Sequence, residues 1–218
     1  SNRESVRTGD ELRISFVVIG KGLRYLPYFY VSLRELGKIG IGAERVPFSL
    51  LRIETEDGQT VLQGSDSLKL SEPYPITFDL QAGESRQSRF TIHLETPARI
   101  MVESRICENP TPKDIVTQLV RRLFLLGYFH DSWAATPFGG HFIDVAEQCK
   151  VVTADYTKTS SVRQSGRNNA TMSFDGVIGS ALCEGDLGYL MPVFRVGEYI
   201  HVGKSAGFGM GKIRVEEK

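Results

Sequence analysis

Glycines gather near the carboxyl end of the chain, in residues 197–215, which read GEYIHVGKSAGFGMGKIRV. The stretch follows an apolar, helix-like run and precedes Ile213 and Val215, which alternate like a strand. Glycine reaches positive φ values and lets another backbone approach closely. We therefore expect a helix end, a loop shaped to meet another surface, and then a final strand.

The side chains of this loop suit a phosphodiester chain. Lys204 and Lys212 flank it, and Phe208 lies between them. Exposed amides, positive charge and a stacking ring are groups that bind nucleic acid. We predict that the loop cradles a nucleic acid backbone and that two upstream arginines contact phosphates. The predicted contacts are Arg163, Arg167, Gly203, Lys204, Ser205, Gly207, Phe208, Gly209, Gly211 and Lys212.

Two other interpretations of the loop stay open. Glycine punctuates turns everywhere, so the first is a plain structural turn. The second is a nucleotide-binding P-loop, because Gly203, Lys204 and Ser205 look like the end of one. A P-loop has four residues between its two glycines, whereas Gly197 and Gly203 have five between them. It also follows a strand and opens a helix, which reverses the order expected here.

Bulk composition gives no hint of nucleic acid. The chain has 218 residues, 41% hydrophobic and 24% charged, which fits one large or two small globular domains. Lysine plus arginine and aspartate plus glutamate each number 26, so the net charge is zero. A basic surface must therefore be a local patch, and solvated surface is the alternative reading of each cluster. The clusters are Arg121 and Arg122; Lys158, Arg163 and Arg167; and Lys204 and Lys212.

Cysteine usage and hydropathy exclude several classes of protein. Cys107, Cys149 and Cys183 are far apart and form no C-x-x-C pair, which argues against a thiolate zinc site and a disulfide framework. No run of 18 apolar residues is present and residues 1–10 are polar, so we expect neither a membrane span nor a signal peptide. We predict a cytoplasmic protein without a metal or other cofactor.

Local periodicity predicts strand, helix, strand and hairpin in the first third of the chain. Apolar residues alternate over residues 12–18, which predicts a strand. Apolar residues at spacings of three and four between Leu26 and Leu36 predict a helix that ends at Gly37. A second strand is expected over about residues 48–55, and Asp57-Gly58 predicts a hairpin turn that leads to Val61 and Leu62.

The remainder predicts a βαββαβ unit. The expected strands cover residues 90–94, 150–156 and 171–182, and a last strand follows the glycine-rich loop. Thr111 and Pro112 open a helix that ends before Gly127, and a second helix is expected over residues 187–202. Residues 131–142 are predicted as an insertion or long loop, and residues 157–169 as a polar connection.

An ordered set of segments resembles one protein family. The set comprises residues 94–100, Arg121-Arg122-Leu123, Arg163-Gln164, residues 176–179, Gly185-Asp186, residues 190–204 and residues 208–215. It resembles the CRISPR-associated endoribonucleases that cut CRISPR repeat RNA, the sixth Cas family of the repeat-associated mysterious protein (RAMP) superfamily. The match runs from about residue 14 to the end of the chain.

The resemblance implies an α+β fold with two tandem ferredoxin-like (RRM-like) βαββαβ domains. By that comparison residues 1–85 form a first domain without its first strand and helix, and residues 86–218 form a second domain that carries the glycine-rich loop. We therefore expect that the chain is truncated at its amino end. The implied partners are CRISPR repeat RNA and other CRISPR effector subunits, and the oligomeric state is not predicted.

The resemblance also implies metal-independent chemistry, in which a ribose 2′-hydroxyl attacks its own phosphate and leaves a 2′,3′-cyclic phosphate. Such a reaction uses a base, an acid and a cation, usually His, Tyr and Lys. His201, just before the loop, is the catalytic candidate, and a helix cap is its alternative role. His93 should face away from its apolar strand neighbours, and His130 and His141 are expected at the surface.

Two functions stay open at this stage. In the family the catalytic histidine usually lies near the first helix of the first domain, which this chain lacks by comparison. The first function is therefore an endoribonuclease or a fragment of one, and the second is a noncatalytic RNA-binding subunit of a CRISPR effector complex. A structural protein unrelated to RNA is a third, more distant, interpretation.

Overall fold

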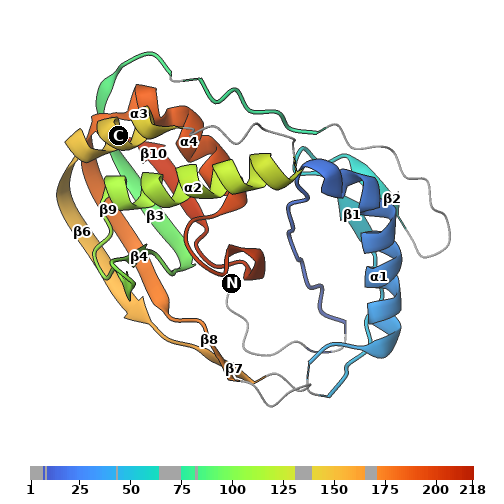
Figure 1. The fold of residues 1–218 in the computed structure, drawn as a ribbon. Coiled ribbons are helices and arrows are strands. Elements are labelled where there is room, and N and C mark those ends of the chain that lie inside the picture. Colours follow the sequence, from blue (N-terminus) through green and yellow to red (C-terminus); the bar gives the residue numbers. More distant parts are fainter. Residues whose placement is uncertain are drawn as a thin grey trace.

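A four-stranded antiparallel sheet organises the computed structural model, which describes residue 7 and residues 9–42, 44–63, 75–81, 83–130, 139–164 and 171–218. Its strands are β3 (Gln87–Ala98), β6 (Lys150–Thr159), β9 (Gly176–Asp186) and β10 (Ile213–Glu217), in the order β10-β3-β9-β6. With α2 (Pro112–His130) and α4 (Leu187–Ile200) they follow the chain order βαββαβ (Figure 1). The predicted ferredoxin-like α+β unit is confirmed.

The hydrophobic core lies between this sheet and its helices. On β3, Phe90, Ile92 and Leu94 are buried, while the interleaved His93 is partly exposed. The Phe90 ring lies 6.1 Å from the Phe194 ring of α4. Strand alternation therefore places the helices on one face of the sheet and leaves the other face to polar residues.

Side-chain caps begin the two long helices. At α2 the Asp114 amide donates to Thr111 Oγ1 over 3.3 Å, and the Thr111 hydroxyl donates to Asp114 Oδ2 over 2.7 Å. At α4 the Tyr189 amide donates to Asp186 Oδ1 over 3.0 Å. The bonds from the Asp114 and Tyr189 amides satisfy donors that have no partner within their own helix. Helix α4 ends at Ile200, two residues before the predicted end.

A third helix corrects the prediction for residues 131–142. Residues 131–138 lie outside the described residues, but α3 covers Gly140–Gln148. Phe142 is fully buried in the core, because α3 packs beside both α2 and α4. The predicted strand over residues 171–182 is also wrong in extent, since β8 (Thr171–Ser173) pairs with β7 (Val162–Gln164) and β9 begins separately at Gly176.

The first third of the chain forms a helix and a hairpin beside this unit (Figure 1). A 3₁₀ turn, η1 (Gly20–Tyr25), leads into α1 (Leu26–Ile39). The helix predicted from Leu26 is confirmed, but it continues past Gly37, the predicted end, to Ile39. Strands β1 (Arg52–Glu54) and β2 (Thr60–Gln63) pair around Gly58, whose φ of 83° fits the predicted Asp57-Gly58 turn.

The strand predicted over residues 12–18 is absent. These residues belong to no strand among those described, and Leu12, Ile14 and Phe16 are exposed. Alternation alone does not make a strand, because the backbone groups need a paired neighbour.

Candidate nucleic-acid interface

The glycine-rich loop is fixed at its base to the end of strand β3. The amide of Gly211 donates to the Pro97 carbonyl over 2.9 Å, and the amide of Lys204 donates to the Arg99 carbonyl over 3.0 Å. The Thr96 hydroxyl donates to the Gly209 carbonyl over 2.8 Å. The loop therefore rests on residues 96–99, a contact between segments far apart in the sequence.

Two glycines at this base permit contacts that no larger residue would allow. Gly211 has a φ of 70°, and a Cβ there would lie 1.9 Å from the Val202 carbonyl oxygen. Gly203 has a φ of 82°, and a Cβ there would lie 2.6 Å from the Arg99 carbonyl oxygen. Both positions need glycine because of backbone approach and positive φ together. This part of the loop fits the structural-turn interpretation.

The tip of the loop, in contrast, presents an aromatic ring. A 3₁₀ turn, η2 (Ala206–Phe208), carries Phe208, which is 61% exposed. Its ring stands edge-on to Phe174 with centroids 5.9 Å apart. Met210 is buried behind it. The base of the loop is thus anchored to residues 96–99, whereas its tip is exposed. One face of the Phe208 ring remains available for stacking.

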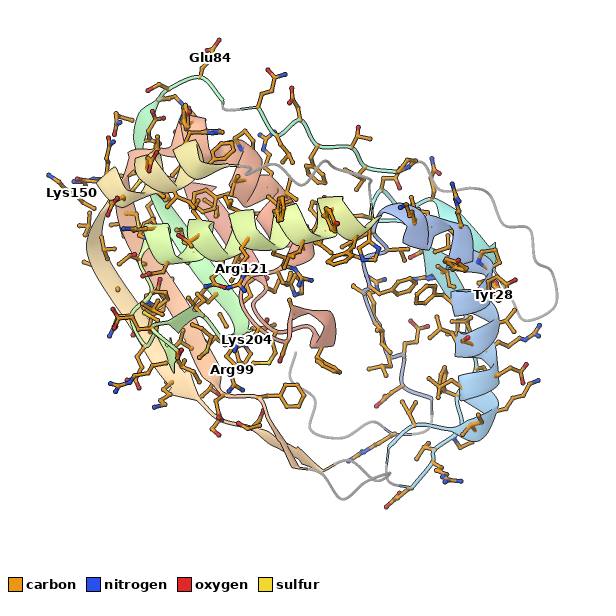
Figure 2. The ribbon with its side chains drawn as sticks, in the orientation of Figure 1. Tyr28, Glu84, Arg99, Arg121, Lys150 and Lys204 are labelled. Atoms are coloured by element: carbon orange, nitrogen blue, oxygen red, sulfur yellow. The ribbon has the colours of Figure 1, made fainter. Side chains whose placement is uncertain are left out.

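Two cations adjoin this ring without carboxylate partners. Lys204 and Arg99 are joined by an antiparallel backbone bridge, and neither side chain forms an ion pair with the described residues. Arg99 Nη1 donates to the Ser173 carbonyl over 3.4 Å, while its Nε is buried without a partner in the described chain. Arg99, Lys204 and Phe208 are called the loop-end surface below. Figure 2 shows Arg121 of α2 projecting into the same region in that view.

One carboxylate lies near Arg99 but is engaged elsewhere. Asp175 Oδ1 accepts a hydrogen bond from the Ser160 hydroxyl over 2.5 Å, and Oδ2 accepts one from Ser173. These hydroxyls, with Arg99 and Lys158 at longer range, lower the pKa of Asp175. The charge of Arg99 is therefore attracted by Asp175 but is not neutralised in a direct ion pair.

Other predicted basic residues are paired within the protein. Lys212 Nζ lies 2.9 Å from Glu95 Oε2, and Arg214 Nε lies 2.8 Å from Glu95 Oε1. Hydrogen bonds from Lys212 and Arg214 lower the pKa of Glu95. Lys158 Nζ lies 2.7 Å from Glu108 Oε1. Sequence spacing gave no signal for these pairs, because each partner comes from a different element.

The remaining predicted arginines differ in position. Arg122 is half-buried and donates from Nε to the Ile200 carbonyl over 2.7 Å, so it closes the end of α4. Burial lowers its pKa. Arg121 is exposed. Arg163 lies on β7 opposite Met172, and Arg167 lies outside the described residues.

His201 is half-buried at the junction of α4 and the loop. It is the C-cap residue of α4, and its Nδ1 lies 3.1 Å from the Met210 carbonyl oxygen. Burial lowers its pKa, and Arg122 and Lys212 act in the same direction, while the bond to Met210 opposes them. Its backbone has φ 64° and ψ 164°, a combination found almost only in glycine and costing of order 1–3 kcal/mol.

The other three histidines lie away from the loop-end surface. His93 faces the polar side of the sheet as predicted, with Nε2 3.3 Å from Glu216 Oε2. His130 and His141 are exposed, which confirms their predicted surface positions. Of the four histidines, His201 alone adjoins the glycine-rich loop.

The face of the sheet opposite the helices carries paired charges. Arg89 Nε lies 2.5 Å from Glu184 Oε1, and Arg214 Nε lies 2.8 Å from Glu95 Oε1. Among the described residues on this face, none is Phe, Tyr or Trp. It therefore lacks the aromatic stacking platform by which RRM-type sheets bind bases.

Two other kinds of site are absent from the described residues. No helix there is both long and apolar enough to cross a bilayer. No group of three or more His, Cys, Asp or Glu side chains comes together there in a way that could hold a metal ion.

Family comparisons match both parts of the chain. A model of the family described as CRISPR-associated endoribonuclease Cas6 matches residues 92–213. A second model, AF_1859_N, described as an N-terminal domain, matches residues 1–77. The first match covers more than half of the sequence and includes β3 from Ile92 onward, both long helices and the glycine-rich loop. The chain belongs to the Cas6 family.

Several solved structures are similar to this chain at low sequence identity. The product complex of Cas6 TTHB231 from Thermus thermophilus has a TM-score of 0.51 and 16% identity, over 88% of this chain and 71% of that chain. A partial Cas6-RT-Cas1–Cas2 complex has a TM-score of 0.52 and 14% identity, over 89% and 34%. The product complex of Cas6 TTHA0078 has a TM-score of 0.43 and 16% identity, and 62% of this chain covers 55% of that chain. No curated protein matches the sequence.

Proposed function

We propose that this chain binds CRISPR repeat RNA through its loop-end surface and takes part in processing CRISPR precursor RNA. The observation that carries the proposal is the pairing of Arg99 and Lys204 by a backbone bridge, with no ion pair to the described residues, beside the exposed Phe208 ring. Unpaired cations release counterions when they meet phosphates, and the ring can stack on a base. Family membership supports RNA as the polymer.

Two domains are proposed, with residues 1–85 forming a partial first domain and residues 86–218 a second. The two family models support this division, since they end at residue 77 and begin at residue 92. The described core cluster also draws its buried residues from Phe90 onward.

The proposed reaction is metal-independent cleavage by the ribose 2′-hydroxyl. A base removes the 2′-hydroxyl proton, and the oxygen bonds to the adjacent phosphorus. The bond from phosphorus to the 5′-oxygen breaks, and that oxygen takes a proton. The products are a 2′,3′-cyclic phosphate and a 5′-hydroxyl. His201 is the proposed base, and Lys204 with Arg99 would stabilise the phosphorane charge.

The other predicted loop residues keep supporting roles in this proposal. The loop tip, from Ser205 to Gly209, would cradle the backbone. The amides of Phe208 and Gly209 already donate to the carbonyls of Ser205 and Ala206, over 2.9 and 3.0 Å. Lys212 would contact RNA only by exchanging Glu95 for a phosphate. Arg163 and Arg167 stay proposed phosphate contacts.

The test uses the full chain and the labelled repeat RNA of the CRISPR array in its source genome, in buffer containing EDTA. We expect a single cut, whose upstream product resists phosphatase until acid opens its cyclic end. A repeat with one 2′-deoxynucleotide at the cleaved position should bind and stay intact. Cleavage that stops with EDTA and continues on the 2′-deoxy repeat would contradict this chemistry.

A noncatalytic RNA-binding subunit is the second candidate function. The observation that favours it is the isolation of His201, because the other three histidines lie away from the loop-end surface. This candidate predicts repeat binding that weakens steeply with salt and leaves the RNA uncut. The same gel assay separates the two functions.

A further inference from the structure

Helix α1 carries apolar side chains on two opposite faces. One face packs against the chain, since Tyr30 is buried and the Phe48 amide donates to the Gly37 carbonyl over 3.0 Å. At 3.6 residues per turn, Tyr28 and Ile39 lie on the side opposite Tyr30, and they are 69% and 63% exposed. A surface helix normally presents polar residues on its outer side, and a helix that is apolar all round is usually buried. The outer face of α1 therefore calls for a covering partner.

The residues of this outer face are spaced symmetrically about one small side chain. Tyr28 and Leu36 lie four residues from Ser32 on either side, and Tyr25 and Ile39 lie seven residues from it. Spacings of three and four are those by which helices pack along a seam. Tyr25, Tyr28, Ser32, Leu36 and Ile39 are called the α1 stripe below. Figure 1 places α1 at the margin of the molecule, on the side away from the four-stranded sheet.

An identical helix laid antiparallel across the α1 stripe brings complementary side chains together. A two-fold axis at Ser32 places Tyr28 of one copy beside Leu36 of the other. The same axis places Tyr25 beside Ile39 of the other copy. Each aromatic ring then meets an aliphatic side chain, and the small Ser32 at the crossing lets the two helix axes approach.

The exposed apolar area is large enough for a weak dimer. The four apolar side chains of the stripe are between 40% and 69% exposed. Phe29, two turns before Leu36, is 47% exposed, and the ring of Phe16 stacks on it at 6.1 Å and is 45% exposed. Side chains of this size offer about 200 Å² each, so the six leave roughly 600 Å² per copy in water. Two copies would bury about 1,200 Å², the lower limit for a specific interface.

We infer that the α1 stripe is a homodimer interface, in which two copies of this chain pack α1 against α1 in antiparallel fashion and cross at Ser32. The stripe holds no charged residue, and the neighbouring Glu35 carboxylate accepts from Lys38 Nζ at 2.8 Å, so the pairing buries no unpaired charge. The same patch is used by both copies, so the assembly closes at two. The inference is independent of the proposed RNA binding, because it uses none of the loop-end residues.

Sedimentation velocity of the full chain, without RNA, tests the interface. We expect the wild type to pass from monomer to dimer between about 1 and 100 μM, the range of a small interface. Leu36→Glu sets an unpaired carboxylate against Tyr28 of the other copy and should raise the dissociation constant at least about a hundredfold. Val31→Glu is the matched control, because Val31 is also 40% exposed on α1 but lies outside the stripe. It should change the dissociation constant by less than about threefold.

Each other result of this experiment overturns the inference. A wild type that stays monomeric throughout the range has no such interface. Equal weakening by Leu36→Glu and Val31→Glu means that added charge, rather than the stripe, controls association. A melting temperature that falls in Leu36→Glu but not in Val31→Glu, measured where the wild type is monomeric, means that the stripe packs within its own chain. Association that appears only after repeat RNA is added means that RNA joins the copies.

Cross-linking of introduced cysteines with a short bismaleimide tests the antiparallel arrangement. Ser32→Cys should link two copies efficiently, because position 32 faces itself across the axis. A mixture of Tyr28→Cys and Leu36→Cys should link more than either variant alone. The wild type, with its own three cysteines, gives the background. Preferential linking of Tyr28→Cys to itself would indicate parallel helices, and equal linking by Val31→Cys and Ser32→Cys would indicate random collision; both overturn the inference.

Discussion

The polar face of the sheet and the loop-end surface both contain basic residues, but several of those on the sheet are held by carboxylates. On the sheet, Arg89 pairs with Glu184, and Glu95 pairs with both Lys212 and Arg214. At the loop end, Arg99 and Lys204 form no ion pair with described residues. A count of basic residues therefore overstates the RNA-binding surface, because a paired cation must give up its carboxylate before it can hold a phosphate.

The largest expected effect tests whether the loop end depends on its anchored base. Gly211→Ala would place a Cβ 1.9 Å from the Val202 carbonyl oxygen at a φ of 70°. We expect it to lower the free energy of unfolding by about 2–4 kcal/mol, because of steric strain and a displaced loop. Gly207→Ala is the matched control, since a Cβ there has open space. Equal melting temperatures for the two variants would show that the base is not rigid.

The next largest effect is expected from removing the unpaired cations, which tests whether RNA binds at the loop-end surface or at the sheet face. Arg99→Ala with Lys204→Ala should weaken repeat-RNA binding by roughly tenfold to a hundredfold and reduce the slope of log affinity against log salt by about 1.4. Arg89→Ala with Arg214→Ala removes the same charge from the sheet face and should change affinity by less than about threefold. Filter-binding titrations at several salt concentrations measure both. If the sheet-face variant lost more affinity than the loop-end variant, the result would indicate that RNA binds at the sheet.

The exposed Phe208 ring should contribute less to RNA affinity than the two unpaired cations, Arg99 and Lys204. Phe208→Ala removes a stacking surface that is 61% exposed and makes little core contact. We expect about a tenfold loss of affinity with little change in salt slope, because stacking releases no counterions. Phe208→Trp should restore binding. A melting temperature that falls markedly in Phe208→Ala would instead indicate that Phe208 packs within the protein.

The smallest effect is expected from freeing two paired cations on the sheet face, so that they resemble the unpaired cations of the loop-end surface. Glu95→Gln removes the carboxylate shared by Lys212 and Arg214, and freeing them should tighten RNA binding by about twofold to fivefold. The pKa of Glu95 is lowered in the folded protein, so its stabilising effect is present above the ordinary value of 4.5 and is lost as pH falls through the folded value. Wild type should thus exceed Glu95→Gln in stability by at most about 1 kcal/mol at pH 7, with the difference vanishing in acid.

Sequence patterns predicted the elements whose determinants are local. Thr111 and Pro112 marked the start of α2, the alternation of Phe90, Ile92 and Leu94 marked β3, and Asp57-Gly58 marked the hairpin. The failures involve partners distant in sequence. Residues 12–18 alternate like a strand but have no paired strand among the described residues, and α3 forms where Phe142 can enter a core built by other elements.

For the candidate site, too, local sequence features were predicted correctly and contacts between distant residues were missed. Glycine spacing located the loop, and Phe208 was correctly predicted to be accessible at its tip. Arg99 was missed because it is joined to the loop by a bridge to Lys204, more than a hundred residues later in the chain. Lys212 was predicted to be available because its partner, Glu95, lies on β3 and is far away in the sequence. The residues around Lys212 give no sign of this ion pair.

Asp186 links the segment that leads into β3 to the start of α4. Its carboxylate accepts hydrogen bonds from the Ser85 hydroxyl, from the Arg86 amide over 2.7 Å, and from the Tyr189 amide that begins α4. The segment that leads into β3 and the first turn of α4 therefore share one carboxylate. Losing that carboxylate would release both segments at once, although they are about a hundred residues apart in the chain.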